Sequence, residues 1–468
     1  MAIKRTNTTD SKIGLQIYKN NTLWENQDGV SDLGEFVMAF TVEEAIDSPT
    51  IVGEIILQDA AGLVNRLTGS ERWKITLDTG ARSSSESSQT SYNLRAYNID
   101  SRARQGSSEA YVIQLVSYEF LINESISLFG SSEVIFSGGL KSNQIVENIL
   151  RGNATGGAMT TKNLFAEETQ NDQKFISCNW RPFDVIYHLA NRSIRKSSAG
   201  SKSQNGFIFW ENVMGYHFKS IDQVIADINA QSNEESNPSN GTARMYTYSY
   251  QPKKAGDEDS DSYRIDSITY PEDRNFLKIM RNGSYAGFST ALDPSKFSNS
   301  KLSVENKQSQ TPQVYDIEDF WNDMEHLDNV QCPVSTYDDD VKQIVKSKRR
   351  IRYTPLPNRL FDPKGQSSEQ SANTQNLDEL PFLDAYKHLR VNSFKSTRIL
   401  INIPGNLDLY AGYGITINIP NTKASGSTVT KDLRYSGKYC IAAVKHKYSE
   451  NTLFTELLLY KDGVKTAA

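Results

Sequence analysis

The stretch "GKYCIAAVKHKYSENTLFTELLLYKDG", from Gly437 to Gly463, has the pattern of two apolar strands that flank a polar turn. Apolar and polar residues alternate through much of both halves, which is typical of an antiparallel hairpin with one buried face. A similar series of strand-like segments occurs near the other end of the chain. This repetition is the main basis for the predicted fold.

Four strand-like segments near the start of the chain match four near its end, in the same order. Single matches are weak, because Ile-Thr-Ile strings are common in β proteins and Ile113 falls opposite Glu456. Four matches in order favour a duplicated β domain over chance similarity of strands. The matched pairs are residues 54–59 with 399–404, 73–79 with 413–419, 92–99 with 439–446, and 111–117 with 454–460.

Helical patterns occupy the region between the two copies. Apolar residues recur at helical spacing from Leu140 to Leu150, and Pro182 suits the first turn of a second helix. A third helix is predicted from Leu380 to Arg390, and an aromatic hairpin is predicted from Gly206 to Lys219 with its turn at Glu211–Asn212. Polar low-complexity stretches predict exposed loops or linkers at residues 82–91, 197–205, 230–243, 253–262 and 363–376.

These patterns predict an α+β chain that is mainly β, with two similar antiparallel β-barrel domains and a mixed α/β domain between them. A chain of 468 residues is too long for one core, and its hydrophobic content of 37% suffices for several. The predicted division is residues 1–121 for the first barrel, 122–261 plus 299–378 for the middle domain, 262–298 plus 379–463 for the second barrel, and 464–468 for a tail.

Charge and cysteine usage exclude several classes of protein. The formal net charge is -5, and the only short basic run is Lys346–Arg350, so sequence-specific nucleic-acid recognition is not expected. The cysteines Cys178, Cys332 and Cys440 are far apart, which favours free thiols in a reducing compartment. No apolar run is long enough for a membrane span, and the start has no apolar signal segment, so we expect no membrane insertion and no export by a signal peptide.

The sequence offers little catalytic chemistry. Phosphate-loop, nucleophile-elbow and zinc-helix motifs are missing, and the five histidines lack metal-ligand spacing. We interpret His188 and His446 as structural or surface histidines rather than catalytic bases, and the acidic run Asp338–Asp340 as a solvated loop rather than a cation site. No catalytic, cofactor-binding or metal-ligating residue is therefore predicted. A pair of glycosidase carboxylates stays open, because acidic residues are numerous.

Two motifs near the end of the chain resemble a known family. The first, "IPGNLDLYAGYGITINIP", contains Gly405, Asn406, Leu409, Gly412 and Ile415. We expect both glycines to supply turn conformations and Leu409 to pin the crossover to the core. The second, in the closing hairpin, consists of Val444, His446, Phe454, Thr455 and Leu457.

Together with the aromatic hairpin, the helix from Pro182 and the segment Ser125–Leu150, these motifs are similar to the central baseplate hub proteins of T-even-like contractile-tailed bacteriophages. The loops near Arg82 and from Thr422 to Lys431 are longer than that family leads us to expect.

The resemblance implies a structural, non-enzymatic hub without a cofactor. Such hubs are homotrimers in which two barrel domains per chain form a pseudo-six-fold ring, between the six-fold tail tube and the three-fold central spike. The implied partners are the chain itself, a spike protein with or without lysozyme activity, and tail tube and other baseplate proteins. DNA would pass through the ring without sequence-specific binding.

The resemblance further implies a location in the virion tail baseplate after synthesis in the host bacterial cytoplasm. Five aromatic residues of the predicted hairpin are candidates for the subunit interface: Phe207, Phe209, Trp210, Tyr216 and Phe218. The alternative functions are a tail-associated cell-wall glycosidase, which needs two facing carboxylates, and a carbohydrate-binding β protein, which needs an exposed aromatic platform.

Overall fold

The computed structural model describes most of the chain. The predicted polar loops at 253–262 and 363–376 lie outside the described residues, as do most of 82–91 and 197–205 and the long loop at 422–429. The described ranges are 11–25, 29–79, 89–136, 140–152, 158–170, 172–196, 204–251, 263–271, 275–292, 313–328, 330–347, 350–355, 380–421 and 430–465.

The N-terminal strands form one curled antiparallel group, which we call the N set. Inward-facing apolar side chains alternate with exposed ones along each strand and share a single core that contains Trp73, Ile113 and Leu115. The strands lie in the order β3-β4-β7-β6-β5-β1. Their bounds are β1 (Lys12–Lys19), β3 (Val37–Ala45), β4 (Val52–Asp59), β5 (Arg72–Asp78), β6 (Gln89–Gln105) and β7 (Ser108–Val116), with the two-residue β2 (Thr22–Leu23) paired to β1.

The C-terminal strands form a second group, the C set, around a core that contains Ile401, Ile415 and Leu457. Its strands lie in the order β15-β19-β22-β21-β20-β13, and the short β14 pairs with β13. Their bounds are β13 (Tyr246–Tyr250), β14 (Arg264–Ile265), β15 (Ser267–Thr269), β19 (Thr397–Pro404), β20 (Gly414–Asn418), β21 (Gly437–Ser449) and β22 (Thr452–Lys461).

The two sets repeat the same arrangement of strands. In the N set, β6 pairs first with β5 and then with β7, and β7 also pairs with β4. In the C set, β21 pairs first with β20 and then with β22, which also pairs with β19. Each long strand carries a bulge where it changes partners, at Tyr97 in β6 and at Ala442 in β21. The duplicated series of strands predicted from the sequence is therefore present, with the same neighbours in both sets.

The residue-by-residue match within that repeat was wrong. The β6–β7 and β21–β22 hairpins both turn through two residues, so Gln105 corresponds to Ser449, and Ile113 then corresponds to Leu457 rather than to Glu456. The sequence matches of β4 and β7 are shifted by one residue, and those of β5 and β6 by two. The bulges do not cause this, since Tyr97 and Ala442 occupy equivalent places in the two sets. A shift of two residues keeps apolar and polar positions in phase, so short segments compared one by one do not fix the register.

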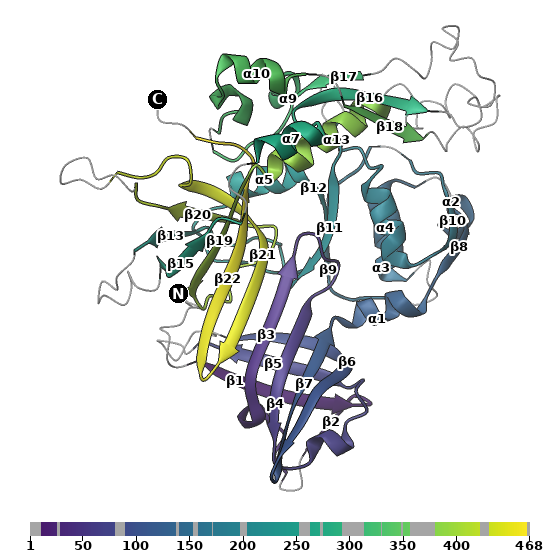
Figure 1. The fold of residues 1–468 in the computed structure, drawn as a ribbon. Helices are drawn as coiled ribbons and strands as arrows, with labels where there is room; N and C mark the ends of the chain where they lie inside the picture. The colour runs from purple at the N-terminus through teal and green to yellow at the C-terminus, as the bar shows by residue number, and fades with distance from the viewer. Residues whose placement is uncertain are drawn as a thin grey trace.

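Closed barrels are not found. Among the described residues no ladder joins β1 to β3 or β13 to β15, so each set is a curled, open sheet. The two sets instead join edge to edge, since β3 pairs with β21 (Figure 1). Another difference concerns the outer strands, because β1 runs antiparallel to β5 whereas β13 runs parallel to β20.

A mixed α/β part follows the N set. The helices predicted at Leu140 and Pro182 are confirmed and pack against the three-stranded sheet β11-β12-β9. Two of its strands form the predicted aromatic hairpin, whose turn is Val213–Met214 and not Glu211–Asn212. The bounds are α1 (Tyr118–Ser125), β8 (Leu128–Ser131), α2 (Ser132–Ile135), α3 (Ser142–Arg151), β9 (Asn163–Ala166), β10 (Ile176–Trp180), α4 (Pro182–Ala190), β11 (Phe207–Asn212), β12 (Gly215–Ser220) and α5 (Ile221–Ala230).

A second small sheet, β17-β16-β18, packs against the helix that starts at Leu380. Two strands lie in other sheets than the predicted boundaries imply. β13 falls within the predicted middle domain but belongs to the C set, and β16 falls within the predicted second barrel but belongs to this small sheet. These pairings join segments far apart in sequence, which local patterns do not report. The bounds are α7 (Phe276–Asn282), β16 (Ala286–Leu292), β17 (Gln313–Asp316), α9 (Ile317–Trp321), α10 (Asp339–Val345), β18 (Ile351–Pro355) and α13 (Leu380–Phe394).

Candidate functional site

The ladder between β3 and β21 is the centre of the candidate site, because it joins the two strand sets. It runs from Ala39–Ser449 to Ala45–Ala443, and Thr41 faces Lys447 within it. Both strands also pair on their other edges, β3 with β4 and β21 with β22. The ladder therefore makes one continuous sheet of two similar halves. We call it the intrachain joint.

The family-motif residues converge beside this joint. The Asn406 backbone N–H donates to Thr455 Oγ1 at 3.1 Å, and His446 Nδ1 lies 2.9 Å from the same hydroxyl. Asn406 Nδ2 donates to the Tyr248 hydroxyl at 2.9 Å. Burial lowers the pKa of His446 to about 4, so its imidazole is neutral at physiological pH. These contacts tie the loop after β19 to β21, β22 and β13.

The remaining motif residues serve packing, with one exception. Leu409, Ile415, Val444 and Leu457 lie in the core of the C set. Phe454 is on the outer face of β22 and is 42% exposed.

The two motif glycines act in different ways. Gly412 has a φ of +89°, as expected for a turn glycine, and a Cβ there would lie 2.4 Å from Trp210 Cζ2. Gly405 is not in a left-handed conformation, which corrects the expectation for it. It is needed for close approach, since a Cβ would lie 2.6 Å from Leu453 Cγ and 2.8 Å from the Leu453 carbonyl oxygen.

Glu44 is the residue that sequence reasoning missed. It follows Phe40 and Val42 on the buried face of β3, and this charge within an apolar alternation was the available signal. Its two carboxyl oxygens accept the backbone N–H of Val213 at 3.0 Å and that of Ala411 at 3.2 Å. Burial raises the pKa of Glu44 to about 8. One carboxyl group thus binds the β11–β12 turn and the motif loop to the intrachain joint.

The aromatic hairpin formed by β11 and β12 also binds the motif loop, at Ala411. Trp210 Nε1 and Asn212 Nδ2 both donate to the Ala411 carbonyl, at 3.0 and 3.1 Å. Trp210 also stacks on His217, with ring centroids 4.7 Å apart. The five aromatic candidates for a subunit interface, Phe207, Phe209, Trp210, Tyr216 and Phe218, are all buried within the chain. They leave almost no surface for another subunit, and we attribute them to the core.

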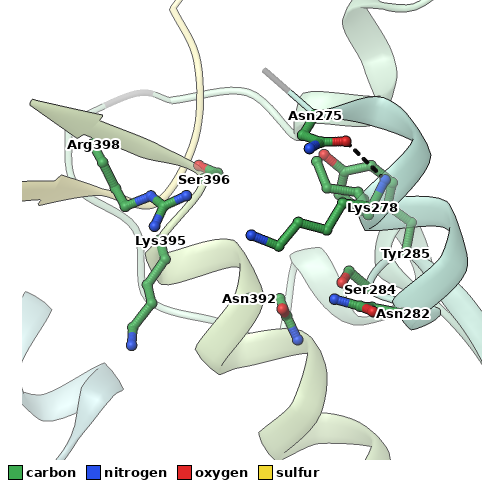
Figure 2. Close-up of a pocket in the computed structure, with 10 residues that line it drawn as sticks. Asn275, Lys278, Asn282, Ser284, Tyr285, Asn392, Lys395, Ser396 and Arg398 are labelled. Carbon is green, nitrogen blue, oxygen red and sulfur yellow. Dashed lines mark hydrogen bonds between the residues drawn. The ribbon is translucent and has the colours of Figure 1, made fainter. Parts of the chain in front are cut away.

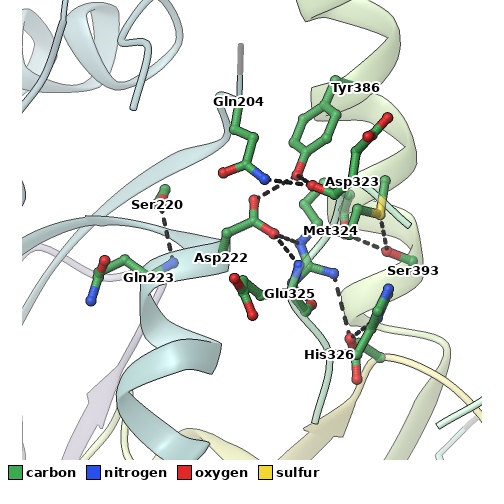
Figure 3. Close-up of polar contacts among 12 residues, drawn as sticks. Gln204, Ser220, Asp222, Gln223, Asp323, Met324, Glu325, His326, Tyr386 and Ser393 are labelled. Atoms are coloured by element: carbon green, nitrogen blue, oxygen red, sulfur yellow. Dashed lines mark hydrogen bonds and ion pairs between the residues drawn. The ribbon is translucent and has the colours of Figure 1, made fainter. Parts of the chain in front are cut away.

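A buried ion cluster fixes the middle helices to the end of β22 (Figure 3). Arg390 of α13 is fully buried, and its Nε lies 3.0 Å from Asp222 Oδ1. Its guanidinium also lies 3.5 Å from Asp462 Oδ2, and it donates to the Glu325 carbonyl at 2.5 Å. The Tyr386 hydroxyl donates to Asp222 Oδ2 at 2.9 Å. A single cation therefore links α5, α13 and the residue that follows β22.

A basic hollow of about 220 Å³ lies between α7, the end of α13 and the start of β19 (Figure 2). Lys278, Lys395 and Arg398 line it together with asparagines and serines, and no carboxylate is among its lining residues. This hollow therefore lacks the facing acids that a glycosidase needs, whereas a second hollow of about 450 Å³ is lined by Asp227, Glu234 and Glu235. Across the described ranges, no group of three His, Cys, Asp or Glu is placed to hold a metal ion. Within the same ranges, no helix is long and apolar enough to cross a membrane.

The comparison with solved structures identifies the fold. The 43 kDa tail protein of prophage MuSo2 from Shewanella oneidensis aligns with a TM-score of 0.50 at 7% identity, over 97% of this chain and 98% of that chain. The chain has the fold of a phage tail protein.

Other solved structures align with lower scores. The tail protein from Neisseria meningitidis MC58 gives a TM-score of 0.45 at 8% identity, over 97% of this chain and 98% of that chain. The Francisella PdpA-VgrG complex gives 0.46 at 9% identity, over 99% of this chain and 54% of that chain. No protein-family model matches the chain, and no curated protein matches its sequence.

Replacing Gly412 by Ala should destabilise the chain by about 3 kcal/mol or more, because left-handed strain adds to a clash with Trp210. Gly106 is the matched control, since it has a φ of +62° and nothing within 4 Å of a built Cβ. Gly106→Ala should therefore cost only about 1–2 kcal/mol of backbone strain. Urea unfolding of both variants measures the difference. Equal losses would contradict the close contact of Gly412 with Trp210.

Replacing Glu44 by Gln should flatten the pH dependence of stability. The folded-state pKa of about 8 lies above the ordinary value of 4.5, so the folded chain binds the extra proton between these values. The stability due to protonated Glu44 is complete below pH 4.5 and is lost as the pH rises through 8. Between pH 6 and 9 the wild-type chain should lose about 2 kcal/mol more than Glu44→Gln.

Thermal or urea unfolding at pH 6 and pH 9 measures this loss. Glu43→Gln is the matched control, because Glu43 is the exposed neighbour on the same strand and should leave the pH dependence of the wild type unchanged. A Glu44→Gln variant with the full wild-type pH dependence would show that Glu44 is ionised normally.

Proposed function

We propose that the chain is a structural, non-enzymatic baseplate hub of a contractile phage tail. In this proposal it forms a homotrimer. Each chain contributes its N set and its C set as two tube-type domains, and the six domains of the trimer make a pseudo-six-fold ring. The observation that carries the proposal is the same strand order in both sets, with the same change of partner at a bulge. The likeness of the fold to a phage tail protein supports it.

The physical reason is symmetry matching. A contact repeats only where its surface repeats, so a three-fold object needs six similar surfaces to bind a six-fold tube. Two similar sets per chain provide them in a trimer. The hub then joins the six-fold tail tube to a three-fold central spike protein, with other baseplate proteins around it.

The DNA passage would run through the ring. The net charge of -5 fits this role, because a strongly basic wall would hold the phosphates of the DNA. We further propose that the hub resides in the virion tail baseplate and is made in the host bacterial cytoplasm. The middle part, with α3 and α4, would lie away from the tube and form the cup for the spike.

Light scattering on the purified full chain should give three times the chain mass of 52.6 kDa. A permanent trimer of this kind buries more than about 2,000 Å² per contact, so the mass should hold on dilution. A stable monomer would contradict the hub. A monomer that also clears a peptidoglycan suspension would favour the cell-wall glycosidase instead.

A further inference from the structure

The intrachain joint uses two particular strand edges. One is the outer edge of β3, at the end of the N set beside β4, and the other is the edge of the second half of β21 in the C set. The repeated strand order gives each of these edges a counterpart. β15 occupies the place of β3, beside β19, and β6 occupies the place of β21, beside β7. Each chain therefore has two edges of each kind, and the joint uses one of each.

The two counterpart edges carry no partner strand among the described residues. There β15 pairs only with β19, and the second half of β6 pairs only with β7. Side chains at these two edges are also more exposed than the corresponding side chains at the intrachain joint. Tyr97, at the β6 bulge, is 49% exposed, whereas Ala442 at the β21 bulge is 3% exposed. Tyr270, just after β15, is 40% exposed, whereas the corresponding Val42 of β3 is 2% exposed.

We infer that β15 of one chain pairs with β6 of a second copy of the same chain, edge to edge and antiparallel. The contact repeats, between chains, the ladder that β3 and β21 make within the chain. It satisfies backbone donors and acceptors of two sheet edges that have no partner strand within the described ranges. This inference rests on the proposed homotrimer and identifies the strands that hold it together.

The intrachain joint also predicts the register. Phe40 faces Ile55 in the N set and Ile268 faces Ile401 in the C set, so Thr41 corresponds to Thr269. The β6–β7 and β21–β22 hairpins can be matched by counting back from their two-residue turns. Ala103 faces Ala110 in the first and Lys447 faces Phe454 in the second, so Ala103 corresponds to Lys447. Because Thr41 faces Lys447 within the chain, Thr269 should face Ala103 of the partner subunit.

The position of the edges suits a ring. Figure 1 shows β15 and β6 on opposite sides of the joined sets. A contact between two different edges is head-to-tail, and it closes into a ring when the rotation per chain fits. N sets and C sets would then alternate, and every joint around the ring would use the same kind of ladder. Three chains would contribute six such joints.

Disulfide formation between Thr269→Cys and Ala103→Cys tests the contact in the full chain. Facing residues of antiparallel strands have Cα atoms about 4.5–5.5 Å apart, within the range for a disulfide. The exposed Cys178 is replaced by Ser, and the buried Cys332 and Cys440 are kept. Oxidation should convert the double variant into covalent trimers on a non-reducing gel, while each single variant stays at the mass of one chain.

Two further variants are matched controls. Thr41→Cys with Lys447→Cys should form the equivalent disulfide inside one chain, with no increase in mass. Thr269→Cys with Arg104→Cys should not cross-link, because neighbouring residues of a strand point to opposite faces. Circular dichroism checks that each variant keeps the wild-type fold.

The outcomes separate this inference from the proposed function. A trimer by light scattering without a Thr269–Ala103 cross-link would overturn the β15–β6 contact and leave the hub proposal standing. A monomer would overturn the proposed trimer and this contact with it. Cross-linked species that extend beyond three chains would support the contact and contradict a closed ring of three.

Discussion

The ladder between β3 and β21 is the interaction on which the rest of the structure depends. It joins two curled sheets of the same strand order along their edges, with backbone hydrogen bonds that do not depend on side-chain identity. An edge ladder of this length fixes both the spacing and the register of the two sets. The relation between them is therefore a property of one polypeptide, set before any second chain arrives.

Buried polar groups reinforce that relation. Glu44 binds backbone groups of two other segments from its place on β3, and Trp210 and Asn212 bind the same loop from the aromatic hairpin. Arg390 plays a comparable part between α5, α13 and the end of β22. Each of these groups is costly to bury unless all its partners are in place, so each favours one arrangement of the segments.

Much of this architecture could be predicted from the sequence, and the failures have physical causes. The duplicated series of strands followed from the repeat, and the helices at Leu140, Pro182 and Leu380 followed from their apolar spacing. The register did not follow, because a shift of two residues leaves the alternation of apolar and polar residues unchanged, so the pattern alone cannot fix the match of β5 and β6 to β20 and β21. The sequence also predicted closed barrels where the described strands form open sheets, since closure depends on pairs between distant strands.

The candidate site was predicted in part for similar reasons. The cluster of Asn406, His446 and Thr455 came from motif residues, whereas Glu44 appeared only as one charge among apolar neighbours. The aromatic hairpin was expected at a subunit contact, but composition alone does not distinguish an interface from a core. Which strand edges stay open is visible only once both sets are placed.

Two similar strand sets in one chain have a direct consequence for assembly, because three chains then present six similar units. Electron microscopy of the purified oligomer in end view measures this most directly. The account predicts a ring of six closely similar lobes that alternate in fine detail and obey three-fold symmetry overall. A ring of three lobes, or six units that differ grossly between the N and C sets, would contradict it.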